Sequence, residues 1–386
     1  MSRDFRQEIE GYTEIRREIE ILRKYPFDYA SYKGRVGELL DLLHPKKIRL
    51  EVSEIRGETK TAKSFRLVSP KGYLPPFQAG QYINLFVDVG GVRTSRPYSI
   101  SSPPNQSGYY EIAVHRVEDG FVSSYLLETV KTGDRVESTA PAGNFYHNPL
   151  FHGNDLVFLA GGSGITPFMS MIREVTDRGL ARKIHLLYGS RSPEDIIFRE
   201  ELEERARRHE NFKVTSVISE PPVGFEGFTG FITAELMKKV LGDAEGKTFY
   251  VCGPEDMYTF CLPELLKLKV PQRKIRMEVF GPPKDVTAQP GWPEFVSANT
   301  RFRVTVKGRK KIDARSGEPL MISLERAGMA IPASCRSGDC SLCRTKLLSG
   351  KVYQPQGAKL RKSDRLYGYI HPCVAYPLGD LEIEVY

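Results

Sequence analysis

The spacing of apolar residues changes character along the chain and divides it into segments. In residues 1–45 the apolar residues recur every three or four positions, as they do on one face of an amphipathic helix. This stripe comprises Phe5, Ile9, Tyr12, Ile15, Ile19 and Leu22, followed by a second set of Val36, Leu39, Leu40, Leu42 and Leu43. We expect a short helical N-terminal extension that packs against the main body; a docking surface for a partner is the alternative.

Residues 46–150 show a different pattern, in which apolar and polar residues alternate over short runs. The clearest runs are residues 83–89, 110–117 and 135–138, and Gly, Pro and Asn turns separate them. Alternation with a period of two predicts strands, and many short strands joined by turns are typical of a closed antiparallel sheet. This segment is therefore predicted to be an antiparallel β-barrel.

Residues 151–281 repeat the order of buried strand, glycine turn and helix. Strands are expected at residues 156–160, 183–188, 212–218 and 248–252, with helical stretches at 167–176 and 194–208. This order predicts an α/β domain with a parallel sheet. A proline-rich linker, residues 282–298, contains the only tryptophan, Trp292, and a small β-rich domain follows in residues 299–386, beginning with a strand at 301–307.

The net charge of the chain is concentrated in the last of these segments. The chain has 386 residues, which exceeds one ordinary hydrophobic core. Its net charge is +8, and residues 300–386 contain 16 Lys and Arg against 8 Asp and Glu, so they hold the whole excess. Such a basic field either steers an acidic partner toward this domain or offsets a bound anionic group. No helix-turn-helix, zinc finger or stacking platform accompanies the charge, so nucleic-acid binding is not expected.

The cysteines and the apolar runs bear on the compartment. No apolar run is long enough to cross a bilayer, and the charged first residues are not followed by the apolar stretch of a secretory signal. Six cysteines, four of them in one pattern, indicate metal ligation in a reducing compartment rather than a disulfide framework. We therefore expect a cytoplasmic protein without a membrane span.

The most specific motif is Cys335-x4-Cys340-x2-Cys343, with Cys373 far downstream. This spacing is the plant-type pattern for a [2Fe–2S] cluster, whereas structural zinc sites usually combine two close pairs of ligands. The residues between the ligands fit a tight turn whose amides donate to sulfur; they are Arg336, Ser337, Gly338 and Ser341. The sequence therefore predicts a one-electron centre, with a zinc site as the alternative.

Three further segments suggest sites for phosphates and rings. Arg96-Pro97-Tyr98-Ser99 ends a barrel strand and offers a bidentate phosphate ligand, a stacking ring and a hydroxyl. Gly120-Phe121-Val122-Ser123 precedes a helical run, so its amides could receive a phosphate and Ser123 could cap the helix. The third segment, residues 160–167, follows a buried strand and opens a helix with glycines that admit a pyrophosphate. It is not the G-x-G-x-x-G fingerprint, and Cys252-Gly253-Pro254 marks another strand end in the same crevice.

In their order along the chain these motifs resemble the ferredoxin–NADP reductase superfamily. The order is R-P-Y-S at 96–99, G-x-V-S at 120–123, G-G-x-G-I-T-P at 161–167, C-G-P at 252–254 and E-V-F-G at 278–281. The C-terminal cysteine motif narrows the resemblance to the phenylacetyl-CoA epoxidase reductase and phthalate dioxygenase reductase type. The resemblance covers residues 46–386 and implies a flavin-binding barrel, an NAD(P)-binding domain and a β-grasp plant-type ferredoxin domain.

The resemblance also implies roles for individual residues. The expected flavin ligands are Arg96, Pro97, Tyr98, Ser99, Val114, His115, Gly120, Val122 and Ser123. Among these, Arg96 and the glycine turn would hold phosphates, Tyr98 would stack on the ring, and Ser99 would lie near flavin N5. NAD(P)H would lie across Gly161, Gly162, Gly164, Ile165, Thr166 and Pro167, with its nicotinamide beside Cys252, Gly253, Pro254 and the acidic Glu278. FAD is preferred to FMN.

Ser190 and Arg191 follow the second strand of the α/β domain and could receive the 2′-phosphate of NADPH. NADPH is therefore weakly preferred to NADH, although Glu194 and Asp195 come close behind.

The sequence as a whole predicts an NAD(P)H-dependent oxidoreductase that passes electrons through FAD and a [2Fe–2S] cluster, singly, to a separate redox protein. The seven histidines show no grouping suited to a mononuclear iron site, so we expect substrate chemistry to belong to that acceptor. The sequence does not fix the acceptor, the direction of electron flow or the oligomeric state. The alternative is a redox-sensing or scaffold protein whose cluster regulates binding without sustained turnover.

Overall fold

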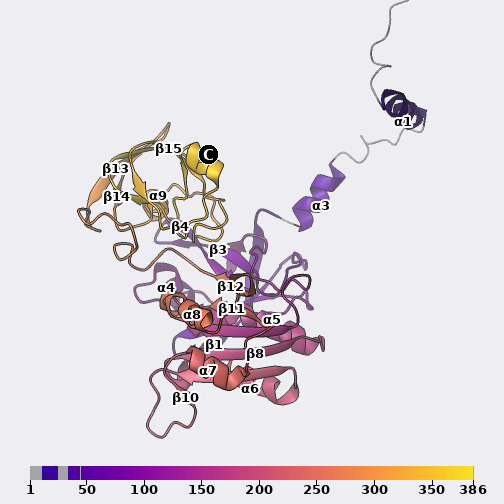
Figure 1. Ribbon diagram of the computed structural model, residues 1–386. Helices are drawn as coiled ribbons and strands as arrows, with labels where there is room; N and C mark the ends of the chain where they lie inside the picture. The colour runs from indigo at the N-terminus through magenta and orange to yellow at the C-terminus, as the bar shows by residue number, and fades with distance from the viewer. Residues whose placement is uncertain (1–10, 25–33, 44, 386) are drawn as a thin grey trace, which may run out of the picture. The chain divides into compact units, whose positions relative to one another are not determined.

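The computed structural model describes residues 11–24, 34–43 and 45–385, and it divides into two compact units, residues 1–45 and 46–386 (Figure 1). In the first unit the described residues form two helices, α1 (Tyr12–Lys24) and α3 (Arg35–Leu43). Neither helix contains a buried residue, and the expected apolar side chains on α1, such as Ile19 and Leu22, are exposed. Phe5 and Ile9 lie outside the described residues, and packing of this extension on the main body stays a prediction.

The second unit begins with the expected antiparallel barrel. Its strands are β1 (Ile48–Thr59), β2 (Ala62–Val68), β3 (Tyr82–Val89), β4 (Val92–Ser99), β5 (Tyr110–His115) and β6 (Arg135–Ser138), in the order β4-β3-β6-β1-β2-β5. An antiparallel bridge between Ile100 and Ile112 joins the two edge strands β4 and β5 and closes the sheet. The alternating residues of these strands fill the barrel, and helix α4 (Phe121–Glu128) adds Val122 and Leu126 to its core.

A parallel sheet follows, in the order β10-β9-β8-β7-β11-β12. The strands are β7 (Asp155–Gly161), β8 (Lys183–Ser190), β9 (Phe212–Ile218), β10 (Phe228–Thr229), β11 (Thr248–Cys252) and β12 (Ile275–Glu278). The connecting helices are α5 (Ile165–Asp177), α6 (Arg199–Arg208), α7 (Ala234–Leu241) and α8 (Glu255–Lys267), with 3-10 turns η2 (Gly162–Gly164), η3 (Pro193–Asp195) and η4 (Gln272–Lys274). Strands β8, β9 and β10 lie on one side of β7, and the next strands, β11 and β12, lie on its other side. Open α/β sheets bind ligands at such a change in the order of the strands.

The single helix expected at residues 194–208 is wrong over its first five residues, 194–198. The chain forms the short turn η3, and α6 begins only at Arg199, after Phe198 in a left-handed conformation with φ +61°. The apolar residues between the turn and the helix, Ile196, Ile197 and Phe198, are all buried. A residue with positive φ cannot continue a right-handed helix, so the helix begins only after Phe198.

The last domain is a mixed five-stranded sheet with two short helices, the arrangement of a β-grasp fold. Its strands are β13 (Arg301–Val306), β14 (Lys311–Arg315), β15 (Thr345–Ser349), β17 (Tyr369–Ile370) and β19 (Leu381–Glu384), in the order β14-β13-β19-β15-β17. Two short strands, β16 (Val352–Tyr353) and β18 (Tyr376–Pro377), pair beside them, and the helices are α9 (Leu320–Arg326) and α10 (Lys362–Leu366). Helix α9 buries Leu320, Met321 and Leu324 in the core of this domain.

The linker is attached to the domains on both of its sides. The ring of Trp292 packs edge-on against Tyr353 and Tyr376 of the last domain, with centroids 5.3 and 6.2 Å away. At its other end, the carboxylate of Glu255 on α8 accepts hydrogen bonds from Lys284 N (2.9 Å) and Gln289 Nε2 (3.0 Å). The linker is therefore a packed strap.

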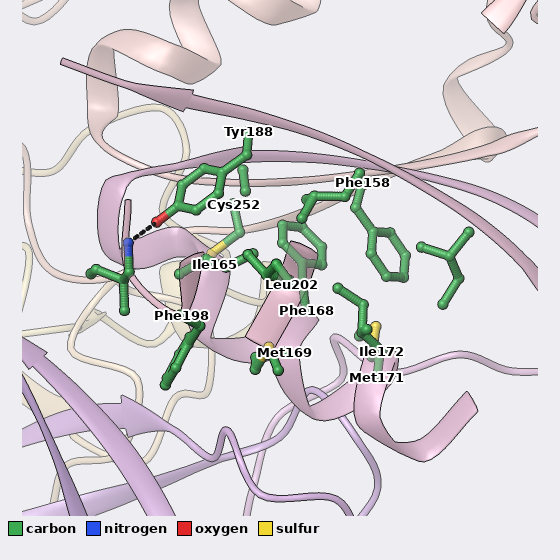
Figure 2. Close-up of a cluster of buried hydrophobic side chains, with 14 of the residues drawn as sticks. Phe158, Ile165, Phe168, Met169, Met171, Ile172, Tyr188, Phe198, Leu202 and Cys252 are labelled. Carbon is green, nitrogen blue, oxygen red and sulfur yellow. Dashed lines mark hydrogen bonds between the residues drawn. The ribbon is translucent and has the colours of Figure 1, made fainter. Parts of the chain in front are cut away.

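The core of the parallel-sheet domain also supports the loops at its edge (Figure 2). Phe158 of β7 stacks on Phe168 of α5 with ring centroids 4.6 Å apart. Tyr188 of β8 is fully buried, and its hydroxyl donates to Gly162 O (2.8 Å) and accepts from Ile197 N (3.2 Å). One phenol therefore holds the glycine turn after β7 and the apolar segment before α6.

We expect Tyr188→Phe to lower the free energy of unfolding by about 1–3 kcal/mol, because it leaves the N–H of Ile197 without a partner and removes one of the hydrogen bonds to Gly162 O. Urea unfolding monitored by circular dichroism measures this change. The control is Tyr367→Phe, at an exposed tyrosine, which should alter the same quantity by no more than about 0.5 kcal/mol. Equal stabilities of the two variants would contradict the structural role of the hydroxyl.

Candidate functional site

The glycine turn after β7 lies against the loop that follows β11. A Cβ atom on Gly164 would come within 2.1 Å of Cys252 O, and one on Gly161 would come within 2.7 Å of Met257 Sδ. Gly253 is equally restricted, since its Cβ would lie 2.5 Å from the same sulfur. The two motifs predicted at separate strand ends therefore share one crevice, where only glycine permits this backbone approach. Ile165, Thr166 and Pro167 are buried in the first turn of α5, so the turn itself is the part exposed to a ligand.

Cys252 and Glu278 are brought together at the same edge of the sheet. They face each other across the parallel strands β11 and β12, and Ala160 of β7 pairs with Cys252 on the other side. Burial, and then the nearby Glu278, raise the pKa of the Cys252 thiol, which therefore stays protonated. Burial also raises the pKa of Glu278 to about 8, with Asp339 and Cys335 adding to the shift. Among the described residues, Glu278 Oε2 has no hydrogen-bond partner.

The R-P-Y-S motif occupies the last residues of β4. Arg96 Nη1 donates to Thr94 Oγ1 and to Ser95 O, both at 2.8 Å, and no acceptor among the described residues meets its other nitrogens. Burial and the neighbouring Arg336 lower the pKa of Arg96 to about 10. A half-buried guanidinium whose remaining N–H groups have no acceptor is suited to bind a phosphate. Tyr98 packs partly on the barrel core, and Ser99 is buried.

The G-x-V-S turn forms the N-terminus of α4, where the first amides of a helix lack intrahelical partners. The N-cap is Gly120, so the expected capping by Ser123 is wrong. Instead, Ser123 Oγ accepts from Val117 N (3.1 Å) and donates to Gly120 O (3.4 Å), which fixes the preceding turn. A Cβ on Gly120 would lie 2.2 Å from Ser123 Oγ, so the turn requires glycine. Val122 lies in the barrel core.

The remaining predicted ligands lie on the barrel strand β5 and at the end of β8. Val114 is fully buried in the barrel core, so its side chain is not accessible to a flavin. His115 Nε2 lies 3.2 Å from Thr61 Oγ1, and burial together with the nearby Arg191 lowers its pKa. Ser190 is buried, whereas Arg191 is exposed and pairs with Asp195, with 3.6 Å between Nε and Oδ2.

The four cysteines of the cluster motif fall into two pairs. Cys343 Sγ lies 3.4 Å from Cys373 Sγ, and the backbone amide of Cys340 donates to Cys335 Sγ (3.3 Å). A [2Fe–2S] cluster takes four cysteine thiolates on two irons, which a paired arrangement fits. The paired arrangement and the plant-type spacing of the four cysteines therefore fit a [2Fe–2S] cluster.

The loop around these ligands has the expected tight turns. Three amides donate to Cys335 Sγ, those of Ser337 (3.4 Å), Asp339 (3.3 Å) and Cys340 (3.3 Å). Arg336 and Ser341 adopt the left-handed conformation, with φ +54° and +59°, a strain that functional loops often store. Cys340 is the exposed ligand, while the other three are buried.

Tyr82 joins the three domains and was missed by the sequence analysis. Its hydroxyl lies 3.0 Å from Ser334 Oγ, next to the cluster ligand Cys335. Its ring packs edge-on against Phe280, two residues after Glu278, with centroids 5.8 Å apart, and its backbone pairs with Ser99 across the barrel. In the sequence it is only the first aromatic residue of an alternating strand, so no local signal distinguishes it from a core residue.

Comparison with known families confirms the three predicted cofactor domains. Residues 48–147 match the oxidoreductase FAD-binding domain, residues 158–262 the oxidoreductase NAD-binding domain, and residues 304–378 the 2Fe-2S iron-sulfur cluster binding domain. The expectations of FAD, NAD(P)H and a [2Fe–2S] cluster are thereby confirmed, and a zinc site is not supported.

Individual proteins show the same arrangement over most of their length. The chain is 29% identical to the glycine betaine monooxygenase reductase subunit of Pseudomonas aeruginosa over 85% of this chain and 92% of that protein. It is 30% identical to NADH oxidoreductase HCR of Escherichia coli K12, over 86% and 96%. The structure of phthalate dioxygenase reductase matches with a TM-score of 0.66 and 26% identity, covering 88% of this chain and 98% of that one. The chain therefore belongs to the flavin-dependent reductases of the ferredoxin–NADP reductase superfamily that carry a C-terminal [2Fe–2S] domain.

Proposed function

We propose that this reductase is the electron-supplying component of an oxygenase system whose terminal oxygenase is a separate protein. The observation that carries the proposal is the position of Tyr82, which contacts both the cluster loop at Ser334 and the end of the NAD-binding sheet at Phe280. The flavin, nicotinamide and cluster sites thus meet at one side chain. Several relatives are named as reductase components of monooxygenases, which supports the class of acceptor and not a sensing or scaffold role.

The roles that we propose for the site residues follow from their surroundings. Arg96 and the amides at the start of α4 hold the FAD phosphates, because Arg96 Nε and Nη2 have no acceptor among the described residues and the first amides of a helix have no intrahelical partner. The nicotinamide binds at the strand ends beside the contact of Gly164 with Cys252, where the protonated Cys252 thiol and the carboxyl of Glu278 border it. When bound, the flavin supplies the conversion of a two-electron hydride into single electrons for the cluster. None of the six cysteines forms a disulfide, and four of them serve as cluster ligands, which supports a reducing compartment such as the cytoplasm.

Electrons leave at the exposed ligand Cys340, beside a surface that we call the exit face. The exit face contains exposed apolar residues and surrounding basic ones: Leu342, Leu366, Tyr367, Lys359, Arg361, Lys362 and Arg365. Lys359 N donates to Gly338 O (3.0 Å) and Arg344 Nη1 to Asp364 Oδ1 (2.9 Å), so the basic segment lies directly on the cluster loop. Exposed apolar and basic side chains near the exposed cluster ligand suit an acceptor with an acidic docking face.

The nucleotide preference that we propose is NADH, which reverses the expectation from the sequence. Asp195 pairs with Arg191, and Glu194 adds a second carboxylate beside it, so a 2′-phosphate would meet two like charges.

The hydride pathway is tested by anaerobic mixing with NADH, which should bleach the flavin band and then reduce the cluster. Gly164→Ala should slow both steps at least tenfold, because its Cβ would displace the Cys252 carbonyl. Reduction of this variant by dithionite should stay normal. Gly189→Ala, whose Cβ would make only ordinary contacts at 3.6 Å, is the control. Flavin and cluster that stay oxidised in the wild type would refute the proposed function.

Asp195→Asn should raise kcat/KM for NADPH several-fold relative to NADH, because it frees Arg191 and removes one repulsive charge. Steady-state rates with ferricyanide measure this ratio. A wild-type enzyme that already prefers NADPH would contradict the proposed preference.

The exit face is tested with a small acidic ferredoxin as electron acceptor. Lys362→Glu with Arg365→Glu should lower the second-order rate about tenfold and flatten its dependence on salt. Lys213→Glu, on an exposed residue of β9, is the control and should change neither. Ferricyanide reduction should be retained in both variants, which separates docking from internal electron transfer. An unchanged ferredoxin rate would place docking elsewhere.

A further inference from the structure

Glu325 is a buried carboxylate between the cluster loop and the barrel. It lies in the last turn of α9 and is 6% exposed. Arg336, the residue after the cluster ligand Cys335 and also 6% exposed, donates to both of its oxygens at 2.7 and 2.8 Å. Removing two charges from water costs several kcal/mol per ion, and a bidentate geometry offsets this cost only if the remaining lone pairs are also satisfied.

The remaining bond to this carboxylate comes from the flavin-binding barrel. Thr94 Oγ1 of β4 donates to Glu325 Oε2 at 2.9 Å. The single hydroxyl proton is thereby committed, so Thr94 Oγ1 serves as an acceptor toward Arg96 Nη1 at 2.8 Å. An unbroken chain of directional hydrogen bonds thus runs from the cluster loop through α9 and β4 to Arg96.

The charges along this chain do not balance. Two guanidinium groups, Arg96 and Arg336, lie near a single carboxylate, Glu325, and only Arg336 is paired with it. The repulsion from Arg336 and the attraction to Glu325 both act on Arg96, so the three charged groups interact electrostatically. An anion bound at Arg96 would neutralise the excess charge in a poorly hydrated place, where it has a large effect.

We propose that Glu325 is a positioning residue that couples phosphate binding at Arg96 to the seating of the cluster loop on the barrel. The inference rests on the proposed role of Arg96 as a ligand of the FAD phosphates. Because such coupling is reciprocal, bound FAD tightens the contact between the loop and β4, and a seated loop raises the affinity for FAD. The FAD site and the cluster loop are thereby both ordered for electron transfer only when FAD is bound and the loop contacts β4.

Two other contacts keep the loop attached when the Glu325 contact is weakened. Asn84 Nδ2 donates to Ala333 O (2.7 Å) and to Ser95 Oγ (2.9 Å), and Tyr82 reaches Ser334. Loss of the Glu325 charge should therefore loosen the seating without separating the domains. A lower affinity for FAD in such a variant, whose domains remain in contact, can then be assigned to the loss of coupling and not to misfolding.

The experiment compares Glu325→Gln with the wild type, using purified full-length protein with and without FAD. The dissociation constant of FAD should rise at least tenfold. Hydrogen exchange of residues 333–338 should slow on FAD addition in the wild type but stay fast in the variant. Cluster content, read from its visible spectrum, should be retained. Glu318→Gln is the control, since Glu318 pairs with Arg326 on the surface and should change neither readout.

A second variant, Thr94→Val, interrupts the chain while leaving the Glu325–Arg336 pair intact. It should abolish the effect of FAD on exchange in residues 333–338 and keep the folded cluster domain. If both variants bind FAD and respond to it as the wild type does, the coupling is refuted, even though NADH still reduces the flavin and cluster. If the wild type binds FAD but NADH reduces neither centre, the proposed function fails while the coupling stands or falls on the exchange data.

Discussion

The seating of the cluster loop on strands β3 and β4 is the contact on which the rest of this reductase depends. Electron transfer between two cofactors in one chain requires that their sites stay adjacent, and here four side chains provide that contact: Tyr82, Asn84, Thr94 and Glu325. All four make hydrogen bonds, whose directions fix one arrangement of the domains. Apolar packing alone would permit sliding, because dispersion contacts have little angular preference.

The fold and the ligand motifs could be predicted because their signals are local. Alternation with period two indicates the barrel, and the order of strand, glycine and helix indicates the parallel sheet, as the comparison with phthalate dioxygenase reductase confirms. The cysteine spacing is likewise a property of one loop. Errors arose where local signals compete, as at Phe198, where burial of an apolar run overrode helix propensity.

The contacts between domains could not be predicted, because they join residues that are far apart in sequence. Tyr82 meets Ser334 across 252 positions, and Thr94 meets Glu325 across 231. Neither pair has a spacing rule, and each residue has an ordinary local role as a strand or helix residue. Within the NAD-binding domain, Cys252 and Glu278 could be placed at one site only through the family resemblance, and the pairing of β11 with β12 is what brings them together.

The strap of residues 282–298 has a consequence for how electrons are delivered. Trp292 fastens one part of it to the ferredoxin domain, and Glu255 fastens another to the NAD-binding domain. Because the linker is packed against both domains, it does not act as a flexible linker. The ferredoxin domain therefore does not move away from the other domains to reach an acceptor. The ferredoxin domain is therefore held in place in this reductase. A separate acceptor has to bind it and take up one electron, and then dissociate or reorient before it can bind again and receive the second.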